Sequence, residues 1–190
     1  MHKPAFIGKK IMRHTLKLMY GFDRWHINTL DERPYAKDII DHCNQRFQRG
    51  SYIEIGCGLG DILMNVNFNK RIGFDNDLRV LKAAGLLAKL KGVNATFKQF
   101  HFPDSELDEK ADVMVMVNWI HHIAPPVLKF YIKKYLDELI EEAGELIIDT
   151  VQDKGYPVNH NIKYLTSDMT YKVVKIGNYD WGREVWSINK

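Results

Sequence analysis

Cysteine and long apolar runs are scarce in this sequence. Only two of the 190 residues are cysteines, and one of them, Cys57, lies among glycines, where a disulfide would obstruct a ligand. No apolar run approaches the roughly 20 residues that a membrane-spanning helix needs. We therefore expect a protein of the reducing cytoplasm, without a membrane span.

Charge of one sign is also scarce. The 27 lysines and arginines and the 24 aspartates and glutamates leave a formal net charge of +3, whereas a nucleic-acid-binding protein needs a dense basic face. No pair of cysteines, His-x-x-x-His spacing or trio of strand-end carboxylates indicates a metal site. Nucleic acid is therefore not expected as a partner, and no metal is expected as a cofactor.

Glycines cluster after a β-prone run at residues 52–55. Gly56, Gly58 and Gly60 alternate with other residues, and Asp61 follows directly. Glycine is favoured where the backbone takes a positive φ or where a ligand lies against bare amides. The spacing departs from the G-x-G-x-x-G of dinucleotide-binding proteins, so a nicotinamide-dependent oxidoreductase becomes the weaker alternative. The stretch predicts a nucleotide cradle.

Two acids extend this pattern. Glu54 lies two residues before the first glycine, which gives E-x-G-x-G-x-G, and Asp75 follows a second β-prone run at 71–74. The chain resembles the class I methyltransferases, whose first strand ends in such a loop and whose second strand ends in a ribose-binding acid. The resemblance implies S-adenosylmethionine as the cofactor and S-adenosylhomocysteine as the product. The alternative role for Asp75 is to cap a helix that begins near Leu78.

From residue 51 onward, strands and helices alternate. We expect strands at 52–55, 71–74, 95–100, 113–117 and 145–150, and helices at about 61–67, 78–91 and 126–142, the last of them ended by Gly144. Two further β-prone runs, 171–176 and 184–188, are too close for a crossover helix and must form a hairpin. The predicted fold is α/β, with a seven-stranded, mostly parallel sheet, helices on both faces and a C-terminal antiparallel hairpin.

The N-terminal segment is basic. Up to Phe22 it has five lysines and arginines and no acid, and Ile7, Ile11 and Leu18 share a stripe at helical spacing. We expect a helix that packs this stripe on the domain. The alternatives are contact with an anionic membrane or a polyanionic acceptor, or a transit peptide.

One domain is expected, in which residues 1–50 form a helical lid packed on a core of residues 51–190. A helix is predicted at about 35–47. In the resembled family, segments before the glycine loop fold over the cofactor and shape the acceptor pocket. This implies a substrate-binding role for Trp25, His26, Arg33 and Tyr35, with a plain loop anchored by aromatics as the alternative.

The remaining site residues follow from the same resemblance. The family's usual adenine-binding acid after the third strand is absent, so Gln99 is expected in its place, with Phe100 or Phe102 packing on the ring. His121 and His122 are candidate general bases because imidazole titrates near neutrality, although a structural role is the alternative. His160 and Trp181 are placed on the substrate side. The predicted cofactor-binding residues are Glu54, Gly56, Cys57, Gly58, Gly60, Asp75, Asn76, Gln99, Phe100, Asn118 and Trp119.

The acceptor is only partly constrained. No proline pair follows Asn118, which disfavours methylation of base amines, and there is no Pro-Cys nucleophile. We expect O-methylation of a small-molecule or glycan-type acceptor, because the single-domain length leaves no room for an appended recognition module. The segment from Trp25-His26 through Arg33-Pro34-Tyr35, taken with Asn118-Trp119-Ile120-His121, resembles bacterial methyltransferases of polysaccharide gene clusters. A non-catalytic subunit that binds S-adenosylmethionine is the alternative. The oligomeric state is not predicted.

Overall fold

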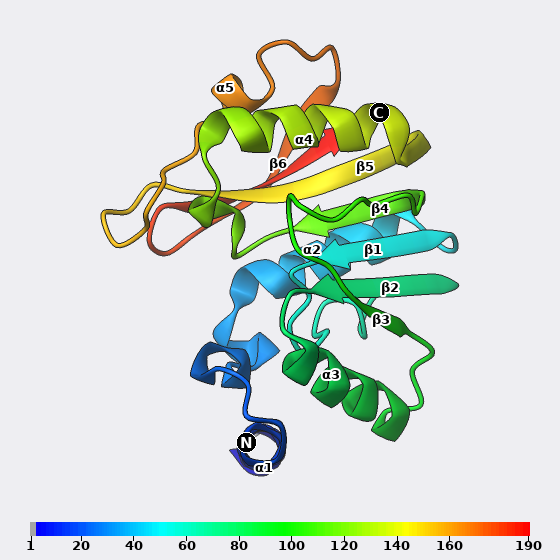
Figure 1. The fold of residues 1–190 in the computed structure, drawn as a ribbon, viewed down its shortest axis with the longest axis vertical. Helices are drawn as coiled ribbons and strands as arrows, with labels where there is room; N and C mark the ends of the chain where they lie inside the picture. Colours follow the sequence, from blue (N-terminus) through cyan, green and yellow to red (C-terminus); the bar gives the residue numbers. More distant parts are fainter. Residues whose placement is uncertain (1–2) are drawn as a thin grey trace.

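A single seven-stranded sheet forms the centre of the molecule, in the order β3-β2-β1-β4-β5-β7-β6 (Figure 1). The computed structural model describes the backbone of residues 3–190 and the side chains from Gly8 onward. The strands are β1 (Ser51–Ile55), β2 (Lys70–Asp75), β3 (Thr96–Gln99), β4 (Ala111–Met116), β5 (Ile140–Val151), β6 (Lys172–Tyr179) and β7 (Arg183–Asn189). The helices are α1 (Lys3–Tyr20), α2 (Pro34–Arg46), α3 (Leu78–Leu90), α4 (Pro125–Glu138) and α5 (Ile162–Leu165), with 3-10 turns η1 (Arg24–Ile27), η2 (Leu30–Glu32) and η3 (Ile120–His122).

Strand direction follows the prediction. The first five strands pair in parallel, while β7 is antiparallel to both β5 and β6. The predicted α/β fold with a C-terminal antiparallel hairpin is therefore confirmed. The carboxyl ends of β1, β2, β4 and β5 meet at one edge of the sheet, and this edge is where sheets of this kind bind ligands.

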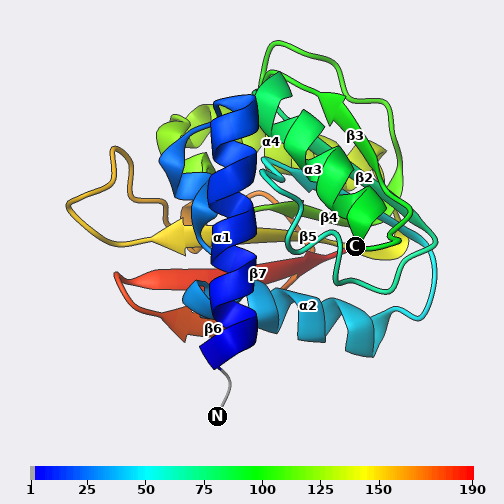
Figure 2. The same cartoon turned by 90° about the horizontal axis from the view of Figure 1, so that it is seen from below.

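Two apolar layers cover the sheet. On one face, Tyr52 and Val115 pack with α2, α3 and Leu16 of α1, and on the other face Ile53 and Met114 pack with α4. Figure 2 shows α1 crossing the outside of the first layer, beside α3. The N-terminal segment thus shares a hydrophobic core with the sheet. None of the described helices is long and apolar enough to span a membrane.

The helix predicted at 61–67 is wrong, because this segment is a series of turns. The side-chain amide of Asn65 donates to the Asp61 carbonyl at 2.7 Å, and so takes the acceptor that the Asn65 amide would use in a helix. The Asn65 amide instead bonds to the Ile62 carbonyl. The Asn65 side chain therefore takes the place of a backbone hydrogen bond that a helix would need.

The prediction that a helix continues to about residue 142 and ends at Gly144 is also wrong. Helix α4 ends at Glu138, and β5 begins at Ile140 with a register shift against β4. Ala143 has a φ of 65°, and a Cβ on Gly144 would lie 2.5 Å from the Asp112 carbonyl oxygen. Gly144 permits a close approach within a bulged strand rather than ending a helix.

Helix α1 forms as expected, but it does not bury the predicted stripe. Ile11 is 61% exposed and Leu18 is 87% exposed, whereas Leu16 and Arg13 face the domain. Ile7 lies outside the described side chains. The face of α1 that is buried carries Arg13, which pairs with Asp61, and hydrophobic spacing alone does not reveal such an ion pair.

Candidate cofactor and acceptor site

The glycine loop leaves β1 in a left-handed conformation. Gly56, Gly58 and Gly60 have φ values of 77°, 53° and 73°. The amides of Gly56 and Cys57 donate to the Phe74 carbonyl at 2.8 and 2.9 Å, and this links the ends of β1 and β2. All three glycines take a conformation that other residues rarely adopt, so the loop needs glycine at each position.

Aromatic side chains lie directly against this loop. A Cβ on Gly56 would collide with the indole of Trp119, and one on Gly58 would lie 2.9 Å from Nδ1 of His26. The indole N–H of Trp119 donates to the Ile55 carbonyl at 2.6 Å. Two predicted site residues therefore lie against the glycine loop: His26, which precedes the loop in the sequence, and Trp119, which follows it.

Glu54 fastens the segment after the loop. Its Oε2 accepts from the Leu63 amide at 2.9 Å, and the side chain is buried. Burial raises the pKa of Glu54 to about 8. This carboxyl therefore holds a proton at neutral pH.

Asp75 supports the loop at the end of β2. One carboxylate oxygen accepts from the Gly58 amide at 2.9 Å, and the other accepts from the Asp77 amide at 3.0 Å. The N-cap of α3 is Asp77, which accepts from the Arg79 amide. The alternative role of Asp75 as that cap is therefore wrong.

The predicted adenine side is only partly assembled at this edge. Gln99 is exposed and donates through its side-chain amide to the Asn76 carbonyl at 3.0 Å. Phe100 is buried in the core against Phe74, with ring centroids 5.6 Å apart. Phe102 instead packs on Trp119 at 5.2 Å. Of the two phenylalanines, Phe102 is the one that borders the cradle.

A buried ion-pair cluster ties the N-terminal segment to the glycine loop. Asp61 is 4% exposed and pairs with both Arg13 and Arg33. Burial opposes ionisation, but the two guanidinium groups lower the pKa of Asp61 below its usual value. Arg13 also donates to the carbonyls of His26 and Asn28. Sequence reasoning missed Arg13 and Asp61, since a lone arginine within an amphipathic helix carries no distinguishing signal.

The other predicted lid residues differ in exposure. Trp25 is 64% exposed, whereas the pKa of its neighbour His26 is lowered by burial, partly offset by Asp75. Tyr35 is buried, and the guanidinium of Arg183 lies 4.8 Å from the centre of its ring. Tyr35 therefore packs against Arg183 in the interior and is not exposed to solvent.

Polar side chains from three elements converge at the end of β4. Asn118 has a φ of 72°, and its backbone amide donates to Asp149 Oδ1 at 3.0 Å. Arg183 forms a buried ion pair with Asp149 and donates to Asn118 Oδ1 at 3.1 Å and to the Tyr156 hydroxyl at 3.2 Å. Asp149 and Arg183 were not predicted. An acid within the apolar run at 145–150 was a usable signal for Asp149, comparable to that of Asp75.

The three candidate histidines occupy different environments. His121 is buried with its Nδ1 unpartnered, and its ring lies 4.4 Å from that of Tyr156. Burial, followed by the charges of His122 and Arg183, lowers the pKa of His121 to about 4. His122 is exposed. His160 is buried with Nε2 2.9 Å from the Ile120 carbonyl, which places it beneath η3.

Two predicted residues lie outside the assembled site. Cys57 is buried and points toward Gly73, where a Cβ would lie 2.8 Å from its sulfur. Trp181 is 73% exposed in the turn between β6 and β7. Cys57 therefore packs behind the loop, while Trp181 projects from the hairpin.

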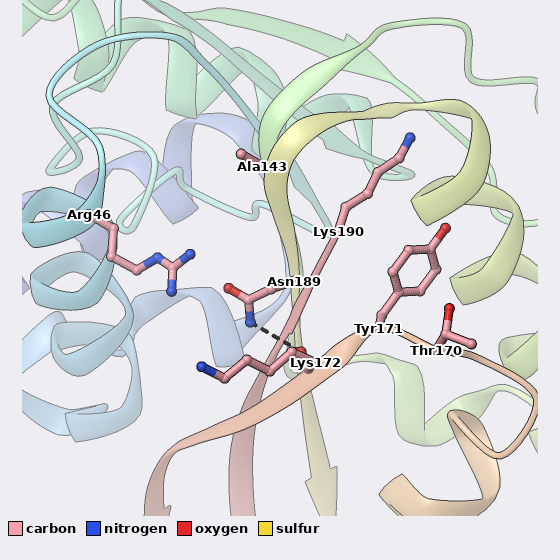
Figure 3. Close-up of a pocket in the computed structure, with 7 residues that line it drawn as sticks. All are labelled: Arg46, Ala143, Thr170, Tyr171, Lys172, Asn189 and Lys190. Atoms are coloured by element: carbon pink, nitrogen blue, oxygen red, sulfur yellow. Dashed lines mark hydrogen bonds between the residues drawn. The ribbon is translucent and has the colours of Figure 1, made fainter.

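A separate pocket of about 470 Å³ lies at the opposite end of the sheet (Figure 3). It is formed where β6 begins and β7 ends, and Arg46 and Lys172 extend toward it from different elements. Arg46 is 3.6 Å from the buried Glu145, and Lys190 donates to the Ile140 carbonyl. None of the predicted site residues lines this pocket, so we place the candidate site at the glycine loop.

Solved methyltransferase structures share this architecture. The N-methyltransferase NodS from Bradyrhizobium japonicum, in complex with S-adenosylhomocysteine, superposes with a TM-score of 0.71 at 15% identity, covering 94% of this chain and 98% of NodS. An S-adenosylmethionine-dependent methyltransferase from Clostridium acetobutylicum gives 0.65 at 14% identity, covering 91% and 94%. The chain has the class I methyltransferase fold. No protein-family model and no curated protein matches its sequence.

The residues at the site fit S-adenosylmethionine. The cradle has left-handed glycines whose missing Cβ atoms let Trp119 and His26 lie against the backbone, and Asp75 lies at the end of the neighbouring strand. Each oxygen of Asp75 has one amide partner and so retains a second lone pair for a ribose hydroxyl. Trp119 and Phe102 supply aromatic surface beside the cradle.

Proposed function

We propose that this chain is an S-adenosylmethionine-dependent methyltransferase that O-methylates a small-molecule or glycan-type acceptor. The observation that carries the proposal is the glycine loop with Asp75 beside it at the carboxyl edge of parallel strands. The methyltransferases whose structures share this fold support it, and NodS was crystallised with S-adenosylhomocysteine. Buried Cys43 and Cys57 are compatible with a reducing cytoplasm.

The cofactor side is assigned to residues already in place. Asp75 accepts from the ribose hydroxyls, the glycine backbone lies against the methionine end, and Trp119 packs on the ligand. Bound there, S-adenosylmethionine supplies an activated methyl group, so the protein must chiefly position the acceptor and exclude water. Residues 1–50 act as the lid over the core of residues 51–190, with His26 above Gly58.

His121 is the proposed proton acceptor. The unpartnered Nδ1 is able to accept from an acceptor hydroxyl, and a pKa of about 4 keeps the imidazole neutral at pH 7, although it makes His121 a weaker base than an ordinary histidine. Asn118, Arg183 and Tyr156 form the polar wall next to it. The exposed indole of Trp25 offers stacking surface suited to a sugar ring.

The test is calorimetry with S-adenosylhomocysteine against a nicotinamide dinucleotide, with a matched pair of glycine variants. Gly58→Ala adds a methyl group 2.9 Å from His26, while Gly92→Ala adds one in open space at a similar positive φ of 65°. We expect S-adenosylhomocysteine to bind and the nicotinamide dinucleotide not to bind. Gly58→Ala should lower the affinity for S-adenosylhomocysteine roughly tenfold or more. Gly92→Ala should retain the wild-type affinity. Equal effects of both variants, or preference for the dinucleotide, would contradict the proposal.

A further inference from the structure

Helices α1 and α3 form a surface that the candidate site does not use. They lie side by side over the same face of the sheet (Figure 2). Neither Lys3–Tyr20 nor Leu78–Leu90 contains an aspartate or glutamate, although α1 has five lysines and arginines and α3 has three. The two helices therefore bring only positive charge to this face.

Some of these cations are neutralised by acids from elsewhere. Lys10 pairs with Glu32, Arg13 is buried against Asp61, and Arg79 pairs with Asp77. Four lysines form no ion pair with any residue that the structure describes, and these are Lys9, Lys17, Lys82 and Lys89. Uncompensated charge thus remains on both helices.

Large apolar side chains are also exposed on these two helices. Ile11 is 61% exposed, Leu18 is 87% exposed and Met19 is 65% exposed, and Leu90 in the last turn of α3 is 65% exposed. Ile11 and Leu18 are two helical turns apart on one side of α1. The opposite side of that helix is fixed by Leu16 and Arg13, so the apolar stripe is held outward.

We propose that this α1–α3 surface docks on an anionic lipid membrane. An interfacial helix combines apolar side chains that enter the lipid with lysines that meet the headgroups, and this surface has both without an intervening acid of its own. A nucleic acid would use the lysines but not the outward Leu18. Turn η1 follows α1 and carries His26, which lies over Gly58, so the docked face adjoins the candidate site.

Vesicle flotation of the full chain tests this proposal. We expect binding to phosphatidylcholine vesicles containing about 30 mol % phosphatidylserine, falling sharply for pure phosphatidylcholine and with added salt. Lys17→Glu should lower partitioning about fivefold or more, and Leu18→Ser about tenfold. The matched controls are Phe130→Ser and Lys163→Glu, which change exposed residues of α4 and α5. These two should bind like the wild type.

Several outcomes would overturn the proposal. These are no binding by the intact chain, equal loss in the control variants, or binding of a polyuridylate RNA that competes with vesicles and is unaffected by Leu18→Ser. Circular dichroism establishes that each variant is folded. Calorimetry with S-adenosylhomocysteine runs in parallel, so that failure to bind membranes is distinguished from failure of the proposed enzymatic function.

Discussion

Asp75 and Asp77 divide two tasks at the end of β2. Asp75 holds the Gly58 amide, and Asp77 caps α3. We predict that Asp75→Ala lowers the affinity for S-adenosylhomocysteine by about 1.5 to 3 kcal/mol, because hydrogen bonds to a charged group are lost. Asp77→Ala should instead lower the free energy of unfolding by about 1 kcal/mol, with little change in affinity. Calorimetry and urea denaturation of both variants would expose a reversed pattern.

His121 gives a prediction in pH. Its pKa of about 4 means that the proton-accepting form is fully present above about pH 5 and is lost as pH falls through 4. The acid limb of kcat/KM for this group should therefore lie near pH 4, not near 6.5. We expect His121→Asn to reduce kcat about 100-fold or more, while the exposed His122→Asn has little effect. Unchanged turnover by His121→Asn would leave a purely structural role.

The strap formed by η1 and η2 depends on one side chain of α1. Arg13 contacts Asp61 and also the carbonyls of His26 and Asn28. Arg13→Met should lower the free energy of unfolding by roughly 3 kcal/mol and weaken cofactor binding, because a buried carboxylate loses a partner. Lys10→Met, which breaks the exposed pair with Glu32, should cost below about 1 kcal/mol.

The difference in unfolding free energy between wild type and Arg13→Met should depend on pH in one direction. The pKa of Asp61 is lowered in the folded protein, so the pairing stabilises the fold above about pH 4, the usual value of an unfolded aspartate. It is lost as pH falls further, through the folded pKa. Urea denaturation should show the gap between wild type and Arg13→Met closing in acid, and a gap that widened there would exclude this account.

Most elements, but fewer of their contacts, were predictable from the sequence. Hydrophobic alternation and the glycine loop were sufficient for the seven strands, and the short link between the last two predicted the hairpin. The segment at 61–67 failed because Asn65 bonds to the Asp61 carbonyl, and α1 failed to bury Ile11 because Arg13 turns another face inward. Asp149 and Arg183 meet only after folding, since 34 residues separate them. Local patterns predict periodicity, whereas such partners depend on the tertiary fold.

For the whole molecule, Glu54 links stability to pH. Its pKa is 4.5 before burial and about 8 in the fold, so the folded protein keeps a proton that the unfolded chain releases. This contribution is fully present below about pH 4.5 and is lost as pH rises through 8. Glu54→Gln keeps an acceptor for the Leu63 amide and should gain stability relative to wild type over that window, by up to a few kcal/mol. Urea denaturation from pH 5 to 9 checks this, and a constant difference would contradict it.

The order of the strands has a consequence for synthesis on the ribosome. Strand β7 lies between β5 and β6, so the edge of β5 has no neighbour until residues 183–189 have been made. That edge carries Leu146, Ile147 and Ile148, all fully buried in the finished fold. A nascent chain therefore presents an open, apolar strand edge from the completion of β5 at Val151 until β7 has been made, and such edges recruit other chains. The same strand delivers Arg183 to Asp149, so closing the edge and completing the acceptor side are one late event.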